Sequence, residues 1–241
     1  MLKKIYETKF YETDFKNRIK DSVLLNFMQD IAADDAEKMG FGYSKIKDKN
    51  IGWFLTKYHI KLFDTLNNNG QISIETESKG YTKISCIRDF DIYNMENIKI
   101  GEATSSWILS DFNTGKIVAP YSIFNNIPMA EKSLLRSNFP KISQLTEYSS
   151  TKDFFAQYSD IDVNQHVNNA VYLTWANDSI PINILNETHI SELEIQYKQQ
   201  VKYGEKVIVY TNIDYENLIF TQEIKLETGI TACLIRQKRI Y

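Results

Sequence analysis

The stretch DSVLLNFMQDIAADDAEKM, residues 21–39, decides how the first half of the chain is expected to fold. Its apolar residues recur at the spacing of one helix face, at Leu24, Phe27, Met28 and Ile31. Asp21 or Ser22 can cap the first turn, and Gly40 is typical of a helix end. The stretch therefore predicts one long amphipathic helix.

Strand-like segments surround this helix. One precedes it at residues 3–12, and four follow it at residues 52–64, 71–79, 82–94 and 99–112. In the first of these four, one face of the strand runs from Phe54 to Leu62 through every second residue, which is the period of a half-buried strand. A long helix followed by a meander of four strands predicts a curved antiparallel sheet wrapped around the helix, and hence an α+β fold.

The second half repeats this order of elements. A strand is predicted at residues 153–160 and a helix at 168–180, and four strands follow at residues 191–202, 205–215, 218–227 and 230–240. Sequence identity adds little, because only Tyr11 and Asn17 align without gaps onto Tyr158 and Asn164. The order of elements predicts two tandem units that pair side by side, as two subunits of a dimer would. A homodimer of the whole chain is also possible.

Residues 113–151 separate the two halves. Three of the four prolines fall there, among many Ser, Asn and Lys residues and without a sustained period. We therefore expect a first domain at residues 1–112, a connector at 113–151 and a second domain at 152–241.

Charge and cysteine content exclude several classes of function. The net charge of −3 gives no bulk attraction to nucleic acid or to an anionic membrane. Cys86 and Cys233 lie far apart in strand-like runs and are expected to be buried, so we predict no disulfide framework and no metal-binding CxxC motif. We also expect no metal and no cofactor. The N-terminus lacks the apolar segment of a signal peptide, and no apolar run is long enough to span a bilayer. We expect a cytoplasmic protein.

A second stretch, DIDVNQHVNN at residues 160–169, gathers carboxylate, amide and imidazole groups directly before the second helix. Asn168 or Asn169 is expected to cap that helix, but a cap needs one such residue and here there are six. Three of these side chains are spaced by two and would share one face of an extended segment: Asp162, Asn164 and His166.

These groups suit the transfer of an acyl group to water. His166 can take a proton from water, and Asp162 can orient the imidazole or attack the carbonyl itself. The Asn164 amide, or free N–H groups at the helix N-terminus, can stabilise the oxyanion that forms. The residue types and their spacing leave open whether Asp162 or His166 acts first.

The run SDIDVNQHVNN at residues 159–169, continued by Tyr172 and Trp175, resembles the signature of the acyl-ACP (acyl carrier protein) thioesterases of plastids and bacteria. The first half resembles the same family at residues 25–42, 52–62 and 103–117. Those enzymes hydrolyse the thioester between a fatty acyl chain and the phosphopantetheine arm of the carrier. Their fold is a tandem pair of hotdog units, each a sheet wrapped around a helix. The resemblance therefore implies a double hotdog fold and a fatty acyl-ACP substrate.

The resemblance also implies site residues. The Asp, Asn and His of the family motif D-V-N-Q-H match Asp162, Asn164 and His166. The family has a Glu and then a Cys at the end of the next strand, where this chain has Gln200 and Val201 in the run IQYKQQV. A Cys–His nucleophile is thereby excluded. Gln200 cannot take up a proton, although it can hold a water or orient a neighbour.

In the family the acyl chain is held mainly by the first unit. The helix face with Phe27, Met28 and Ile31 is then the predicted wall of a chain-binding tunnel, although a place in the core is at least as well supported for each residue singly. An acidic carrier would need a local cationic patch on this protein. The candidate cations are Lys198 and Lys202 near Gln200, and Lys132, Arg136 and Lys141 in a part of the connector without carboxylates.

Three other functions stay open. An acyl-CoA thioesterase would use the same groups. A hotdog enoyl-thioester hydratase uses an Asp and a His separated by four residues, as Asp162 and His166 are. A non-catalytic acyl-thioester sensor would need a DNA-binding module, and the sequence has no basic helix-turn-helix segment. The other two histidines are expected away from the chemistry, with His59 on a strand surface and His189 in a loop.

Overall fold

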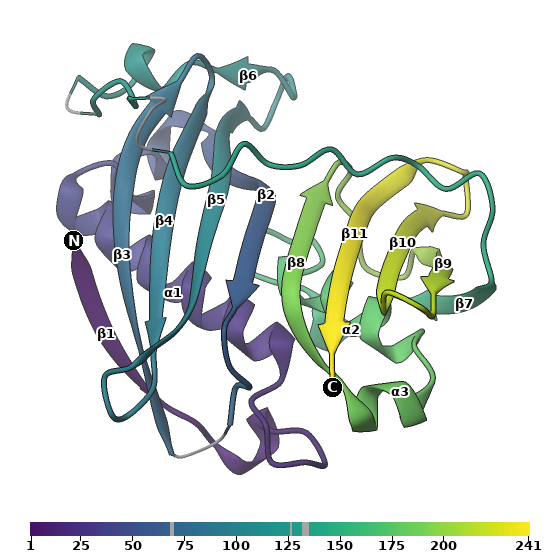
Figure 1. Cartoon of the computed structure of the whole chain (residues 1–241). Helices are drawn as coiled ribbons and strands as arrows, with labels where there is room; N and C mark the ends of the chain where they lie inside the picture. Colours follow the sequence, from purple (N-terminus) through teal and green to yellow (C-terminus); the bar gives the residue numbers. More distant parts are fainter. Residues whose placement is uncertain (68–69, 126, 132–134) are drawn as a thin grey trace.

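The computed structural model describes residues 1–67, 70–125, 127–131 and 135–241. Its first unit consists of one long helix and five main strands: β1 (Leu2–Glu7), α1 (Asp21–Met39), β2 (Ile51–Leu62), β3 (Gln71–Thr82), β4 (Ser85–Tyr93) and β5 (Lys99–Asp111). Figure 1 shows α1 lying across one face of the sheet that these strands form. The helix has the predicted bounds.

The two ends of α1 are fixed in different ways. Gly40 follows the helix with a φ of 81°, a left-handed conformation that glycine adopts without strain, and its N–H closes the last turn. At the start, the predicted cap by Asp21 or Ser22 is wrong, because the N-cap position is Lys20 and no side chain caps it. Asp21 instead reaches the second unit, where its carboxylate accepts a hydrogen bond from Asn177 Nδ2 (3.2 Å).

The second unit repeats the pattern with shorter helices. Its elements are β7 (Ser150–Phe155), α2 (Asn169–Asp178), α3 (Ile182–Glu187), β8 (His189–Tyr197), β9 (Lys206–Asp214), β10 (Ile219–Leu226) and β11 (Thr231–Ile240). The helix predicted at 168–180 is thus slightly too long, and α3 was not predicted. His189 begins β8, so its prediction as a loop residue is wrong.

The two units share one antiparallel sheet. The strand order is β1-β3-β4-β5-β2-β8-β11-β10-β9-β7, and the short strand β6 (Ile117–Val118) pairs with β5. β2 and β8 join the units, with Tyr58 opposite Ile195. The side-by-side pairing of two units predicted from the order of elements is therefore a continuous run of strands in one chain (Figure 1).

An apolar core lies between the helices and the sheet and extends through both units. Its fully buried members come from α1, α2 and several strands of the sheet, among them Leu25, Met28, Ile31, Leu173, Ile195 and Val209. Burial of each such side chain contributes about 1.5–3 kcal/mol, so the helices are held firmly on the sheet. Trp175, Cys86 and Cys233 are buried as predicted. In the described part of the chain, no helix combines the length and the apolar character needed to cross a membrane.

Strand β2 departs from strict alternation at one point. Tyr58, Ile60 and Leu62 are buried as the pattern predicts. A bulge between Leu55 and Lys57 shifts the register, so that Leu55 is buried and Phe54 is only half-buried.

The connector crosses the seam between the units, along the upper ends of the strands in Figure 1. His59 of β2, predicted to lie on a strand surface, is largely buried there. Its Nδ1 lies 2.7 Å from Ser137 Oγ, and its Nε2 lies 2.8 Å from Glu192 Oε1 of β8. The surface prediction is wrong because a segment distant in sequence covers the strand. Gln196 Nε2 adds a hydrogen bond to the Pro140 carbonyl (2.9 Å).

Candidate active site

The stretch 160–169 contains a tight turn and not the extended segment predicted from its spacing. The Asp162 N–H donates to the His166 carbonyl (2.9 Å), and the Gln165 N–H returns to the Asp162 carbonyl (3.0 Å). Gln165 has a φ of 64°, which lets the chain reverse. The predicted side chains are therefore grouped by a reversal of the chain, and the expectation that residues spaced by two share a strand face is wrong here.

Asp162 and Asn164 bond to each other. Asp162 Oδ1 accepts the Asn164 N–H (2.8 Å), and Oδ2 lies 3.4 Å from Asn164 Nδ2, a long hydrogen bond. This is an Asx turn, in which an aspartate side chain fixes a chain reversal. The Asn164 side chain is exposed, so its amide is accessible to a substrate.

His166 is half-buried, and its Nδ1 is shielded from solvent with no hydrogen-bond partner among the described residues. Buried polar atoms without a partner are rare in folded proteins. Burial lowers the pKa of the imidazole, the Asp162 carboxylate opposes this shift only in part, and Lys202 adds to it. The ring is therefore neutral at pH 7 and can take up a proton.

Helix α2 begins directly after this turn. The Asn168 side chain accepts the Ala170 N–H (2.9 Å), which confirms the predicted cap. Asn169, the other candidate, reaches the first unit, where its Nδ2 donates to Gln29 Oε1 (3.1 Å). The helix N-terminus, with its partial positive charge, thus starts within three residues of His166 and favours an oxyanion nearby.

The segment after β8 runs beside the turn. The Val167 N–H donates to the Val201 carbonyl (2.9 Å), so Gln200 is held next to the turn that carries His166. Gln200 is half-buried, and its side chain makes no hydrogen bond within the part of the chain that the structure describes. Val201, at the position of the family's cysteine, is 0% exposed. The fold therefore brings all four predicted catalytic residues to one place.

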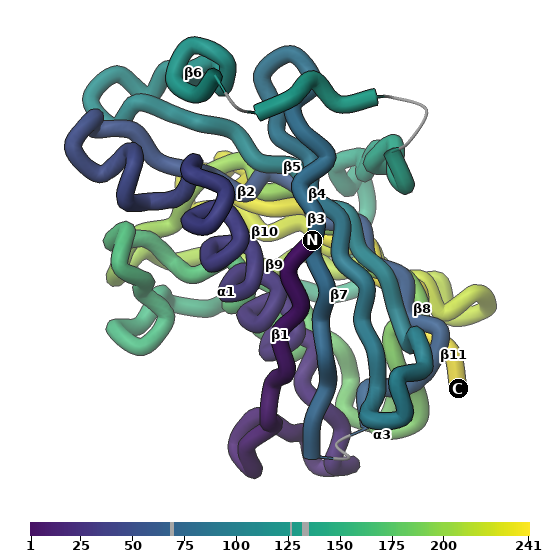
Figure 2. The backbone as a smooth tube through the Cα atoms, turned by 90° about the vertical axis from the view of Figure 1, so that its left-hand side faces the viewer, coloured from purple at the N-terminus to yellow at the C-terminus, as the bar shows by residue number. Residues whose placement is uncertain are grey.

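The three residues predicted to line a chain-binding tunnel lie in the core of the first unit. Met28 and Ile31 are 0% exposed. Phe27 is half-buried and stacks on Tyr6 of β1, with ring centroids 4.4 Å apart. Figure 2 shows the backbone of β1 running beside α1. A cavity of about 480 Å³ lies elsewhere, beside residues 14–22, and none of the three residues lines it. An acyl chain that reached Met28 would have to displace core side chains.

The first unit contains the same turn with different side chains. The Asp14 N–H donates to the Arg18 carbonyl (2.8 Å), and the Asn17 N–H returns to the Asp14 carbonyl (3.0 Å). Asn17 has a φ of 57°, as Gln165 has in the second turn. Arg18 therefore occupies the position of His166.

This match corrects the predicted alignment of the two halves. Single 3-10 turns precede both reversals, at Phe10–Glu12 and at Tyr158–Asp160, and they correspond end to end. The alignment of Tyr11 with Tyr158 and of Asn17 with Asn164 is wrong by one residue. These 3-10 turns also end the first strand of each unit earlier than predicted.

Two family models match the chain, the acyl-ACP thioesterase N-terminal domain over residues 1–122 and the acyl-ACP thioesterase C-terminal domain over residues 143–238. The chain belongs to the acyl-ACP thioesterase family. The chloroplastic oleoyl-acyl carrier protein thioesterase 2 of Arabidopsis thaliana is 22% identical to it over 90% of this chain. The chloroplastic palmitoyl-acyl carrier protein thioesterase of Gossypium hirsutum is 24% identical over 81% of it. The chain spans 65% and 51% of the lengths of these two relatives.

Two solved structures of this family share the fold. An acyl-ACP thioesterase from Bacteroides thetaiotaomicron matches with a TM-score of 0.87 and 24% identity, over 99% of this chain and 97% of the other. The 12:0-ACP thioesterase from Umbellularia californica matches with a TM-score of 0.87 and 16% identity, over 99% and 96%. The predicted double hotdog, an α+β fold, is confirmed.

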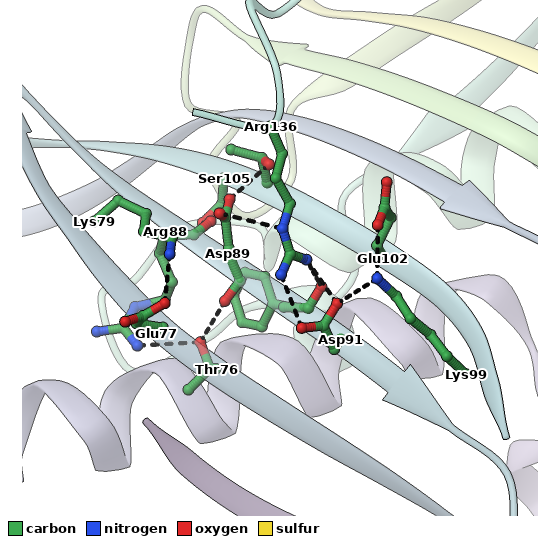
Figure 3. A network of polar contacts seen from close by, with 12 residues as sticks. Thr76, Glu77, Lys79, Arg88, Asp89, Asp91, Lys99, Glu102, Ser105 and Arg136 are labelled. Atoms are coloured by element: carbon green, nitrogen blue, oxygen red, sulfur yellow. Dashed lines mark hydrogen bonds and ion pairs between the residues drawn. The ribbon is translucent and has the colours of Figure 1, made fainter. Parts of the chain in front are cut away.

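Arg136 was predicted to belong to a cationic patch that binds the acidic carrier. Its guanidinium is instead bound within the protein. Its Nη1 and Nη2 donate to the two carboxylate oxygens of Asp91 (2.7 and 2.8 Å), and its Nε lies 3.4 Å from Asp89 Oδ2 (Figure 3). Lys99 joins the network through Asp91 and Glu102. The connector itself lacks carboxylates there, but β4 supplies them, so the prediction of a free cation at Arg136 is wrong.

The other predicted cations differ from Arg136. Lys132 lies outside the described residues. Lys141, Lys198 and Lys202 are exposed. Lys202 also acts on the imidazole of His166, so the end of β8 is the part of the predicted patch nearest to the site.

One group of side chains comes close to the geometry of a metal site. The ligand atoms of His59, Glu192 and Glu194 all lie within 4.8 Å of one another. His59 is already bonded to Glu192, and Glu194 Oε1 accepts a hydrogen bond from Arg236 Nη1 (3.0 Å). A guanidinium at this distance opposes a bound cation. We assign the group to the polar seam between the two units, and the expected absence of a metal stays a prediction.

Proposed function

We propose that this chain hydrolyses the thioester between a fatty acyl chain and acyl carrier protein, giving a free fatty acid and the carrier thiol. The observation that carries the proposal is His166, a neutral imidazole with an unpartnered nitrogen beside the N-terminus of α2. It lies in the unit that matches the family's C-terminal domain.

The proposed reaction begins when Nε2 of His166 takes a proton from a water molecule, because Nδ1 is shielded from solvent. The resulting hydroxide attacks the thioester carbonyl carbon, and the carbonyl oxygen becomes an oxyanion. The exposed Asn164 amide and the Asn169 N–H at the start of α2 stabilise this charge, because the N–H groups of Ala170 and Val171 already donate to Asn168. When the intermediate collapses, the C–S bond breaks, the carbonyl double bond forms again, and the thiolate takes the proton from the imidazolium.

Asp162 and Gln200 have supporting roles in this proposal. Both oxygens of Asp162 engage Asn164, which supports a role in holding the turn over direct attack on the carbonyl. Asp14 likewise accepts main-chain N–H groups of its own turn in the first unit. An aspartate that holds the turn favours a hydrolase over a hydratase, because in a hydratase the aspartate would have to act on the substrate. Gln200 can orient the attacking water through its amide without taking up a proton.

The two units are proposed to divide the substrate between them. Residues 152–241 carry the chemistry, residues 113–151 connect the two units, and residues 1–112 receive the acyl chain. Passage of the chain along Phe27, Met28 and Ile31 requires the core side chains packed there to move, because Met28 and Ile31 are 0% exposed. The exposed Lys198 and Lys202 at the end of β8, with Lys141 of the connector, would attract the acidic carrier. A cytoplasmic location, the absence of nucleic-acid partners and cofactors, and a homodimer stay predictions.

Because Arg136 is not free, acyl-CoA is a second substrate class to test. The experiment is release of free thiol from acyl-ACP and acyl-CoA substrates of graded chain length. A higher kcat/KM on acyl-ACP supports the proposal. A preference for acyl-CoA would replace the carrier by coenzyme A. Release from neither substrate, with binding of both, would favour a sensor, and hydration of an enoyl thioester would favour a hydratase.

A further inference from the structure

The hydroxyl of Tyr172 makes hydrogen bonds to the main chain of the residues before and after Gln200. Tyr172 belongs to α2 and is 2% exposed. Its oxygen accepts the Val201 N–H (3.1 Å), and its O–H donates to the Gln199 carbonyl at 3.4 Å, a long hydrogen bond. The residues before and after Gln200 are thus tied to one side chain of the helix that begins at the catalytic turn.

The aromatic neighbours of Tyr172 fix its ring. The Tyr197 ring meets it edge-on at 5.6 Å between centroids, and the Trp175 ring lies at 5.5 Å. Tyr197 is itself anchored, because its hydroxyl donates to the Asn169 carbonyl (3.0 Å). Burial raises the pKa of the Tyr172 phenol, so it stays protonated and able to donate.

The first unit has the matching turn but no such hydroxyl. The correspondence of the turns places Leu24 of α1 at the position of Tyr172. The Ile19 N–H donates to the Leu66 carbonyl (2.7 Å), as the Val167 N–H does to the Val201 carbonyl. The main-chain bond between turn and strand end is therefore common to both units. The pair of hydrogen bonds from the Tyr172 hydroxyl, the tyrosine clamp, occurs among the described residues only beside His166. A turn of this kind forms without the clamp, so the fold does not require it.

We infer that Tyr172 is a positioning residue, whose hydroxyl holds residues 199–201 so that Gln200 stays beside the turn that carries His166. The inference rests on the proposed hydrolase function. Gln200 makes no side-chain hydrogen bond within the described residues, so its place depends on its two neighbours. A misplacement of about 1 Å at a reacting centre can cost roughly a hundredfold in rate. Loss of the clamp, with the main-chain bond kept, should cost about tenfold.

The test combines kinetics with amide hydrogen exchange. Tyr172→Phe removes only the hydroxyl and should lower kcat on acyl-ACP about tenfold with little change in KM. Exchange at the Val201 amide should become faster, because its acceptor is gone. Gln200→Ala should also lower kcat. The double variant should be no slower than Gln200→Ala alone, because the hydroxyl acts through that residue.

Tyr58→Phe is the matched control. Tyr58 is also buried, but its hydroxyl has no hydrogen-bond partner in the described part of the chain, so the same deletion should leave kcat and Val201 exchange unchanged. The inference is overturned if Val201 exchange is unchanged in Tyr172→Phe, or if the losses from Tyr172→Phe and Gln200→Ala multiply.

Two further outcomes are also decisive. If Tyr172→Phe does not fold, slow Val201 exchange in the wild type supports the clamp and fast exchange overturns it. The reference is the nearby amide of Tyr203, which is 68% exposed and donates no hydrogen bond within the described residues. If the wild type releases thiol from no thioester, the proposed function fails. Val201 exchange in Tyr172→Phe then decides separately whether the hydroxyl holds the segment.

Discussion

The turns at residues 14–18 and 162–166 have the same main-chain hydrogen bonds and different side chains. In the first, Asp14 Oδ1 accepts the N–H groups of Lys16 (2.8 Å) and Arg18 (2.9 Å). In the second, Asp162 Oδ1 accepts the Asn164 N–H (2.8 Å). The aspartate is therefore part of the turn in both units. Its presence does not by itself mark a catalytic site.

The difference lies at the last residue of each turn. Arg18 is fully engaged: Nε donates to Asp14 Oδ2 (2.8 Å), Nη1 to the Thr188 carbonyl (2.9 Å) and Nη2 to the Leu185 carbonyl (2.9 Å). The last two bonds attach the first unit to the second. His166, at the same position, keeps a nitrogen without a partner among the described residues. One copy of the turn thus joins the two units, and the other leaves a titratable group free to act.

The largest effect should come from replacing His166. His166→Ala removes the proposed general base and should lower kcat/KM by roughly a hundredfold to ten-thousandfold. Folding should be little affected, because the ring is only half-buried and its Nδ1 has no hydrogen-bond partner among the described residues. Thiol release from acyl-ACP measures the first effect, and a denaturant titration measures the second. Wild-type turnover in this variant would remove His166 from the mechanism.

The pH profile separates a base from a merely structural histidine. A base must be neutral, and burial lowers the pKa of His166, so the wild-type rate should be flat at neutral pH and fall only below the ordinary histidine range. The residual activity of His166→Ala should lack this acid limb. An identical limb in both proteins would assign it to another group.

Arg18→Ala should affect stability and leave the chemistry intact. Removal of the guanidinium breaks an ion pair, takes the donor from the Leu185 carbonyl, and leaves the Thr188 carbonyl with Arg239 Nη2 alone (3.2 Å). The loss should cost about 2–3 kcal/mol in the free energy of unfolding. The kcat of the folded variant should equal that of the wild type. Arg18→Lys is the control, since it keeps the charge but cannot make the three-way fork. A fall in kcat without a loss of stability would show that the turn at residues 14–18 also takes part in catalysis.

The sequence predicted the elements better than their local geometry. Helix α1 has the predicted bounds because its apolar spacing and the terminal Gly40 are local signals. The chain reversal at 162–166 was not predicted, since its left-handed residue is Gln165 and not the glycine or asparagine typical of such positions. The bulge at Leu55 of β2 likewise has no local sequence signal.

Errors at single residues have a common cause in long-range contacts. His59 and Arg136 were judged from their neighbours in sequence, which carry no matching partners. Their partners are Ser137 and Glu192 for the imidazole and Asp91 for the guanidinium, all supplied by other segments of the fold. The candidate catalytic residues were found because three of them lie in one short run. Tyr172 was not singled out, because its role is visible only when the two units are compared.

The smallest effect should come from the surface proposed to bind the carrier, at the exposed Lys198 and Lys202 that follow β8. No such cationic surface was predicted for the first unit. Lys198→Glu reverses an exposed charge near Gln200 and should raise KM for acyl-ACP about threefold to tenfold at low salt, because surface charges act mainly on association. The effect should shrink as salt is added. Hydrolysis of a short acyl-CoA should be nearly unchanged. Lys238→Glu on β11 makes the same change in net charge at another exposed lysine and should leave both substrates unaffected. Equal losses from the two reversals would show that net charge, and not a docking surface at the end of β8, attracts the carrier.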